Sequence, residues 1–338
     1  MPFTKRRKRE TVPRDIDLKD WENLHSLPAD KENRQPARTI ISSTSYRIVG
    51  GFDLPDRTSY PLEWESYLER VSYFTLAMCH DVEWMGSQPD ELRYVADGSP
   101  RTYYPDLLVQ ANGSECFLEV KPLVYLVQDE NLTRYADIAS RLRARGKRLV
   151  FLTDDQILSV KARTENIMLM RRYITGVLAE EKIGAVHEPL VNQPLSIKEL
   201  VLTGTVDVRD IHTMIAQHHL VVEWDVLITL DAAVRLPTSD DKGLTFERIL
   251  SSGRFSHLLA QLSLGHRPTD QRELALAKAY GQRMRSSAGP SIAGGFPKDK
   301  SKRRIYEPLD DLRETLSSRT AGNGKRASRS LLQRGAAR

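Results

Sequence analysis

Two carboxylates and one lysine lie close together in the sequence, and they have the side chains that can hold a divalent metal ion against a phosphodiester. Asp106 is followed thirteen residues later by Glu119 and then by Lys121. Magnesium takes oxygen ligands, usually one or two carboxylates with water and phosphate oxygens. A bound ion polarises the phosphoryl group and lowers the pKa of its water, while a lysine can orient or deprotonate that water or offset the charge on the phosphate. These residue types predict phosphodiester hydrolysis.

A β-hairpin is expected to position these side chains. Residues 102–109 are rich in aromatic and branched side chains, Asn112-Gly113 is a turn pair that tolerates positive φ, and residues 116–120 resume the strand pattern. Pro105 removes a backbone donor, so the first strand is expected to start or bend beside the aspartate.

Alternation along the second strand separates charged from apolar side chains. Glu119 and Lys121 are expected to share one face, which lines a cleft, while Leu118 and Val120 point into the core. An exposed acidic and basic pair on a hairpin is also common and costs little. The hairpin by itself therefore fits a solvated surface as well as it fits a catalytic site.

The segments around the hairpin favour the catalytic interpretation. Residues 62–78 carry apolar side chains at helical spacing, and Glu65 and Glu69 lie one turn apart on another face of that predicted helix. A second helical stripe runs from 132 to 142, and residues 148–152 form a short strand. The order helix, hairpin, helix and strand predicts an α/β fold with a mixed sheet flanked by helices.

The order and spacing of these segments resemble the TnsA family, the endonuclease subunit of heteromeric transposases. Its catalytic domain has the restriction-endonuclease-like fold of the PD-(D/E)XK nucleases. The similarity covers roughly residues 60–180, and the combination is much more specific than any one segment. The matching segments are Trp64 to Arg70, Gln88-Pro89, Tyr103 to Val109, Phe117 to Pro122 and Phe151 to Asp154.

The resemblance implies roles for individual residues. Asp106 matches the family's central metal-binding aspartate, and Lys121 matches its active-site lysine. Glu119 falls where the family has a glutamate or glutamine. The family's first catalytic glutamate corresponds to Glu69, which the distance to the Gln88 segment favours, or to Glu65 one turn earlier.

The implied cofactor is Mg²⁺, for which Mn²⁺ can substitute, with Asp106, Glu119 and Glu69 as its ligands. Gln88 also matches a position that recurs near the site in the family. A buried amide that only holds its loop explains Gln88 equally well.

The resemblance also implies a biological role. Such an enzyme hydrolyses phosphodiesters at the 5′ ends of a transposon during cut-and-paste transposition. A DDE-type transposase resembling TnsB cuts and joins the 3′ ends of the double-stranded DNA, and an AAA+ ATPase resembling TnsC regulates the reaction. Two alternatives remain: a stand-alone restriction or repair nuclease of the same fold, and an inactive DNA-binding assembly subunit.

Composition limits the class of protein. A chain of 338 residues that is 40% hydrophobic can bury more than one core. The sequence shows no apolar run of about 20 residues and no signal peptide, so we expect a soluble protein of the bacterial cytoplasm with no membrane partner. We expect it to associate with the nucleoid when it is bound to DNA. Its two cysteines, Cys79 and Cys116, are too few for a disulfide framework.

The basic residues are unevenly spread although the net charge is only +5. Both ends of the chain are rich in lysine and arginine, so we expect basic, largely disordered tails that contact DNA phosphates or remain solvated. The N-terminal basic run consists of Lys5, Arg6, Arg7, Lys8 and Arg9. The predicted divisions are a basic segment 1–40, the nuclease domain 41–187, a winged-helix-like helical domain 188–286 and a basic tail 287–338.

The prediction of the second domain rests on local start signals. Ser196 and Glu199 have the spacing of a capping box, and Asp207 can cap a second helix. Residues 220–223 and 227–230 alternate like the two strands of a small wing. Two helices and a wing predict a winged-helix-like domain, a relative of the helix-turn-helix modules. The resemblance to TnsA implies a domain of this kind that contacts the transposition machinery.

Overall fold

A computed structural model gives the three-dimensional structure and describes residues 36–38, 40, 49–54, 56–241 and 243–287. The basic run from Lys5 to Arg9 and most of the predicted terminal segments 1–40 and 287–338 lie outside the described residues. All described residues belong to one unit of the chain, residues 1–294. Within the described part, no helix is both long and apolar enough to cross a membrane.

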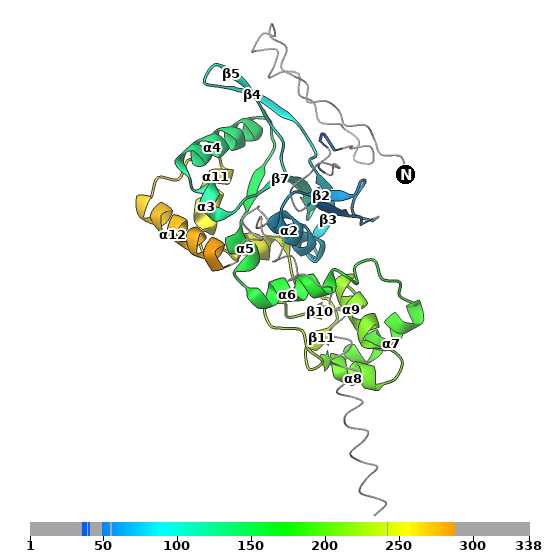
Figure 1. Cartoon of the computed structure of the whole chain (residues 1–338). Coiled ribbons are helices and arrows are strands. Elements are labelled where there is room, and N and C mark those ends of the chain that lie inside the picture. The colour runs from blue at the N-terminus through cyan, green and yellow to red at the C-terminus, as the bar shows by residue number, and fades with distance from the viewer. Residues whose placement is uncertain (1–35, 39, 41–48, 55, 242, 288–338) are drawn as a thin grey trace, which may run out of the picture. The chain divides into compact units, whose positions relative to one another are not determined.

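A four-stranded mixed sheet forms the centre of the fold (Figure 1). Its strands, in spatial order, are β3 (Val82–Ser87), β6 (Leu107–Ala111), β7 (Ser114–Val120) and β8 (Leu149–Leu152). The first three are antiparallel neighbours, and β8 runs parallel to β7. The predicted α/β class with a mixed sheet flanked by helices is therefore confirmed.

The predicted hairpin is formed by β6 and β7. Asn112 and Gly113 make its turn with φ values of 48° and 71°, a conformation in which glycine and asparagine are favoured. The predicted first strand over 102–109 is wrong in extent, because the chain is extended in two separate strands with Tyr104-Pro105-Asp106 between them. Pro105 cannot donate to a ladder, which explains the interruption.

Two strand pairs lie outside the central sheet. They are β1 (Gly50–Phe52) with β2 (Leu62–Trp64), and β4 (Leu92–Ala96) with β5 (Ser99–Tyr103), both antiparallel. Helix α2 (Tyr67–Ala77) follows β2. The predicted helix over 62–78 is therefore wrong in its first residues, which pair as a strand, and Ser66 begins the helix by accepting from the Glu69 N–H.

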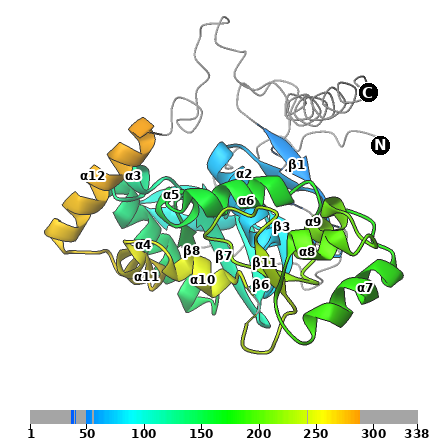
Figure 2. The same ribbon diagram turned by 90° about the horizontal axis from the view of Figure 1, so that it is seen from below.

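Alternation along the strands divides the core into two layers, one on each face of the sheet (Figure 2). Leu118 and Val120 face the layer that contains α2, and Phe117 faces the layer that contains α4. The helices that follow the hairpin are α3 (Leu123–Leu126), α4 (Asp129–Ala144), α5 (Asp154–Leu158) and α6 (Lys161–Met170).

The next part of the chain forms helices around a small antiparallel sheet. In chain order these are α7 (Glu180–Leu190), β9 (Leu195–Ser196), α8 (Ile197–Leu202), α9 (Val208–Ala216), β10 (Val221–Val222) and β11 (Ala233–Arg235). A capping box at Ser196 begins α8 and Asp207 caps α9, as predicted, and Asp210 completes a second capping box that was not predicted. The strand predicted over 227–230 is wrong, because the Asn166 side chain binds the backbone of Trp224 and Ile228 and holds this segment irregular.

The last described helices return to the central sheet. They are α10 (Phe246–Ser251), α11 (Ser256–Ser263) and α12 (Gln271–Ser287). Leu258 and Leu262 of α11 lie in the same core layer as α4 and Phe151 of β8, and α12 packs beside α3 (Figures 1 and 2). A methyl group on Gly281 would lie 2.7 Å from the Val124 backbone nitrogen, so α12 and α3 approach closely because this residue is glycine.

An ion pair between a buried arginine and a partly exposed aspartate joins α6 to the segment between β10 and β11. Arg163, only 3% exposed, donates to both carboxylate oxygens of Asp225 at 2.6 and 2.9 Å. We expect Arg163→Leu to lower the free energy of unfolding by about 2 kcal/mol, because the partly exposed Asp225 loses two charged hydrogen bonds and, among the described residues, keeps only its contact with Arg248. Urea denaturation measures this loss. Lys161→Leu on the exposed face of the same helix should change stability by at most about 0.5 kcal/mol, and equal effects of the two changes would contradict the prediction.

Candidate active site

Asp106, Glu119 and Lys121 meet at one end of the central sheet. Asp106 directly precedes β6. Glu119 is the second-last residue of β7, and Lys121 directly follows that strand. Because β6 and β7 are antiparallel, the start of one strand lies beside the end of the other. The hairpin therefore brings together three of the residues that the sequence predicts.

Asp106 is fixed by hydrogen bonds on both its backbone and its side chain. Its carbonyl oxygen accepts from the Gln88 N–H at 3.0 Å and from the Tyr73 hydroxyl at 3.2 Å. Oδ2 accepts from the Val120 N–H at 2.8 Å. No donor among the described residues contacts Oδ1, so one carboxylate oxygen is held in place and the other is open.

Glu119 is surrounded by donors. The side chain is not on an open cleft wall, because the residue is only 3% exposed beneath α4. Oε1 accepts from the Tyr135 hydroxyl at 2.6 Å and is 2.9 Å from Nζ of Lys121, and Oε2 accepts from the Tyr103 hydroxyl at 2.7 Å. The two tyrosines are functional neighbours that the sequence prediction missed, although a buried tyrosine hydroxyl normally finds a partner.

The charges of this cluster change the pKa values of its members. Burial raises the pKa of Asp106 well above its usual range, and the nearby charges of Glu119 and Glu69 raise it further, while Lys121 acts against them. Burial also raises the pKa of Glu69. The negative charge of Glu119 raises the pKa of Lys121, so its side chain is an ammonium ion at any physiological pH.

Glu69 and Glu65 lie in different environments. The Glu69 carboxylate accepts from the Glu65 N–H at 2.8 Å and from the Ser66 hydroxyl at 2.8 Å, so it also caps the start of α2. Oε1 of Glu65 accepts from Arg38 at 2.7 Å. The spacing of Ser66 and Glu69 is that of a capping box, a signal in the sequence that the helix prediction overlooked.

Gln88 and Arg38 connect the loops around the site. Gln88 is 1% exposed and has a positive φ of 45°, and its side-chain oxygen accepts from Arg38 at 3.2 Å. Non-glycine residues in this region of φ are uncommon and cluster at functional sites. Because the Gln88 N–H also binds the Asp106 carbonyl, Gln88 positions the loop of the open carboxylate. Arg38 was missed, since it lies in the predicted terminal segment 1–40.

The donor set fits a hard cation such as Mg²⁺ in its chemistry. Three carboxylates near one another oppose a single lysine, and Asp106 offers an open oxygen. Within the described part of the chain, no group of three or more histidine, cysteine, aspartate or glutamate side chains is arranged to hold a metal ion. An ion would take its remaining ligands from water and substrate, as magnesium commonly does.

Comparison with known proteins leaves the family open. No protein-family model matches the chain, and no curated protein sequence is significantly similar to it. The resemblance to TnsA therefore remains a prediction, which rests on the motif residues and on their spacing.

The raised pKa of Asp106 predicts a specific effect on stability. Asp106→Asn keeps an oxygen that can accept from the Val120 N–H but removes the charge. We expect the variant to be more stable than the wild type at pH 7, by about 1 kcal/mol. The difference should shrink at pH 5, because the folded wild type then takes up the proton that its raised pKa favours.

Urea denaturation of both proteins at the two pH values, without metal, measures this difference. The buried histidines, whose pKa values are lowered by burial, titrate in both proteins and cancel in the comparison. A variant that is less stable than the wild type at pH 7, or an advantage that grows toward pH 5, would show that Asp106 is not crowded by negative charge.

Proposed function

We propose that this chain is a metal-dependent endodeoxyribonuclease, the function that the resemblance to TnsA implies. The observation that supports the proposal is the meeting of Asp106, Glu119 and Lys121 at one end of the β6–β7 hairpin, with one oxygen of Asp106 open. Three carboxylates are crowded there against the single ammonium group of Lys121, and a divalent ion would relieve the crowding.

Asp106 is the residue best placed to hold the ion. In its present position Glu119 contributes negative charge to the site. It could become a ligand of the ion only by giving up one of its hydrogen bonds. Glu69 is the better candidate for the third carboxylate than Glu65, because its charge raises the pKa of Asp106 and because Arg38 already neutralises Glu65. When bound, Mg²⁺ or Mn²⁺ polarises the phosphoryl group and lowers the pKa of a water molecule.

Lys121 is proposed to stabilise charge rather than to accept a proton. Its raised pKa keeps it cationic, so it cannot act as a base at neutral pH. Its ammonium group is 2.9 Å from Glu119 and can offset the negative charge that develops on a phosphate held at Asp106. Tyr103 and Tyr135 hold Glu119 and through it the position of this ammonium group.

The wider role is also proposed from the resemblance. The chain would cut transposon 5′ ends together with a DDE-type transposase and under an AAA+ ATPase. Helices α8 and α9 with the small sheet would form a winged-helix-like module that contacts the transposition machinery, and the basic tails would contact DNA phosphates. A stand-alone nuclease of the same fold, which would use the same residues Asp106, Glu119 and Lys121, is the second candidate.

Cleavage of DNA tests the proposed activity. We expect the protein with its transposase partner to nick DNA that carries the transposon ends in Mg²⁺, and we expect Asp106→Ala to abolish 5′-end cutting, at least about a hundredfold. Asp240→Ala, a change of an exposed aspartate outside the site, is the matched control. Undiminished cutting by Asp106→Ala would refute the assignment. Cutting without the partner would favour the stand-alone enzyme, and binding without cutting would favour an assembly subunit.

Metal binding can be tested without catalysis. We expect millimolar Mg²⁺ or Mn²⁺ to raise the melting temperature of the wild type, because a ligand that binds only the folded state stabilises it in proportion to the logarithm of its concentration. Asp106→Asn should lose most of this increase, whereas Asp240→Asn should keep it. Equal increases in both variants would place the bound ion away from Asp106.

A further inference from the structure

Three arginines gather where helix α2 packs beside helix α6 (Figure 2). Arg70 belongs to α2, Arg171 is the residue that caps the end of α6, and Arg172 follows it. The guanidinium carbon of Arg171 lies 5.9 Å from the ring centre of Phe74, which is one turn after Arg70 on the same face of α2. Burial lowers the pKa of Arg171, and the nearby charges of Arg70 and Arg172 lower it further. The three side chains therefore form one cluster of positive charge.

This arginine cluster has no acidic counterpart in the described part of the chain. No aspartate or glutamate side chain there forms an ion pair with any of its three members. The Nε atom of Arg70 is buried and has no hydrogen-bond partner among the same residues. Like charges that are held close together repel one another, most strongly where water is partly excluded. A bound anion would supply the missing negative charge.

The position of Arg171 is fixed before any ligand arrives. Its Nε donates to the Met168 carbonyl at 3.0 Å, and its guanidinium group lies over the Phe74 ring. Neither contact uses the two terminal amino groups, which no acceptor among the described residues contacts. Arg172 is exposed, and Arg70 and Arg171 are partly exposed, so an anion can reach the cluster from solvent. The planar guanidinium group presents paired N–H donors that match the oxygens of a phosphate.

We propose that Arg70, Arg171 and Arg172 bind backbone phosphates of the DNA that the candidate active site cuts. The inference rests on the proposed nuclease function, because the cluster lies beside that site. Arg70 directly follows Glu69, whose charge raises the pKa of Asp106. Successive residues of a helix are about 100° apart around its axis, so Glu69 and Arg70 occupy neighbouring faces of α2. Phosphate contacts fix the register of a protein on DNA without reading bases, so the cluster would hold the DNA while Asp106 meets the scissile phosphate.

An acidic peptide is a poorer occupant of the cluster. Protein partners usually bury apolar side chains at the centre of an interface. The Phe74 ring beneath Arg171 is only 6% exposed, so the cluster offers charge but little apolar surface. Contacts with a nucleic acid backbone are mainly electrostatic and need no apolar surface.

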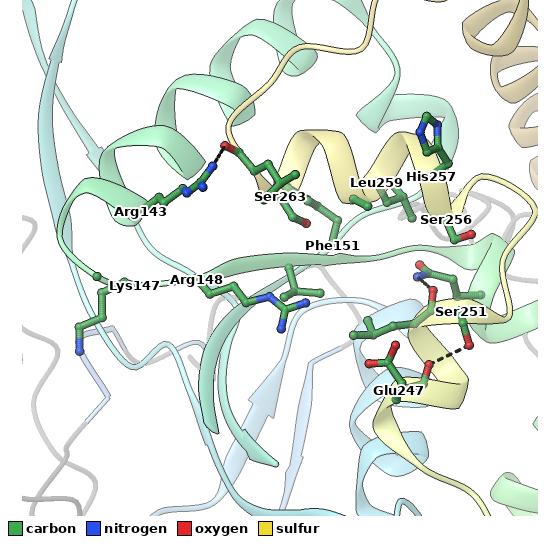
Figure 3. A pocket seen from close by; sticks show the side chains of 16 residues that line it. Arg143, Lys147, Arg148, Phe151, Glu247, Ser251, Ser256, His257, Leu259 and Ser263 are labelled. Carbon is green, nitrogen blue, oxygen red and sulfur yellow. Dashed lines mark hydrogen bonds between the residues drawn. The ribbon is translucent and has the colours of Figure 1, made fainter. Parts of the chain in front are cut away.

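A second basic group of the described chain lies at the other end of the central sheet and provides a control. Lys147 and Arg148, just before β8, line a cavity of about 730 Å³, and Arg148 extends along it (Figure 3). Leu149 pairs with Phe117, and Lys121 lies four residues further along the parallel strands, about 13 Å away. A change of Lys147 and Arg148 therefore removes the same charge far from the candidate active site.

Fluorescence anisotropy with the full chain and a labelled DNA duplex tests the proposal. EDTA is present, so no cleavage takes place, and the salt is varied from about 0.05 to about 0.2 M. We expect Arg70→Gln combined with Arg172→Gln to weaken binding at least about fivefold. The slope of log affinity against log salt should become shallower by about 1 to 2, because each lost phosphate contact removes about 0.9. Lys147→Gln combined with Arg148→Gln should leave the slope unchanged.

Thermal unfolding separates a binding role from a structural one. Because the cluster has no counter-charge in the described part of the chain, the Arg70/Arg172 variant should melt at the same temperature as the wild type or higher. Circular dichroism shows whether each variant is folded. Arg172→Gln alone changes an exposed side chain and should still make the slope shallower by about 1, so it tests the proposal even if the double variant does not fold.

Inorganic phosphate tests a free anion as the occupant. We expect phosphate, compared with chloride at equal ionic strength, to shift the melting temperatures of the wild type and the Arg70/Arg172 variant equally. A shift that only the wild type shows, together with unchanged DNA affinity of the variant, would identify a site for free phosphate instead. A polyglutamate peptide that needs the two arginines while DNA does not would identify a contact with a protein.

Three further outcomes would overturn the proposal. These are failure of the wild type to bind the duplex, an Arg70/Arg172 variant with the affinity and salt slope of the wild type, and equal weakening by the two double variants. Undiminished cutting by Asp106→Ala would refute the nuclease assignment but would leave these measurements in EDTA unchanged. The two proposals therefore fail separately.

Discussion

The carboxylate of Glu119 lies between the central sheet and α4, only 3% exposed, and the arrangement around it follows from that burial. An ionised carboxylate taken out of water costs several kcal/mol unless donors and an opposite charge replace its hydration. Tyr103 from β5, Tyr135 from α4 and Lys121 after β7 provide them. Each donor comes from a different element, so one charge fixes the strand pair β4–β5, helix α4 and the central sheet relative to one another.

Asp106 is held in a different way from Glu119, because most of the groups that fix it are backbone groups rather than side chains. Val120 binds one carboxylate oxygen, and Gln88 and Tyr73 bind the carbonyl of the same residue. The open oxygen is therefore aimed before any ligand arrives, which is what a preorganised site requires. Its raised pKa reflects the cost of keeping charge at this position, a pattern typical of functional sites.

Features of the fold that depend on residues close together in the sequence could be predicted from the sequence. The turn at Asn112-Gly113 and the helix starts at Ser196 and Asp207 each depend on two to four adjacent residues, and all three are confirmed. The donors to the buried glutamate are different, since Tyr103 and Tyr135 each lie sixteen residues away from it on separate elements. Tyr135 lies in the predicted helical stripe over 132–142 and Tyr103 in the predicted strand over 102–109, but a single sequence does not reveal which hydroxyl meets which carboxylate.

The return of α11 and α12 to the sheet has an evolutionary consequence. Arg143 of α4 contacts Leu264 across 121 positions of the chain, and Asp155 accepts from the Phe255 N–H across 100 positions. Segments from distant parts of the gene thus share one core, with the α7–α9 region inserted between them. Recombination that exchanges a contiguous stretch of the gene would split this core, and it would also break the contacts that join the region between α6 and α10 to α2 and α6.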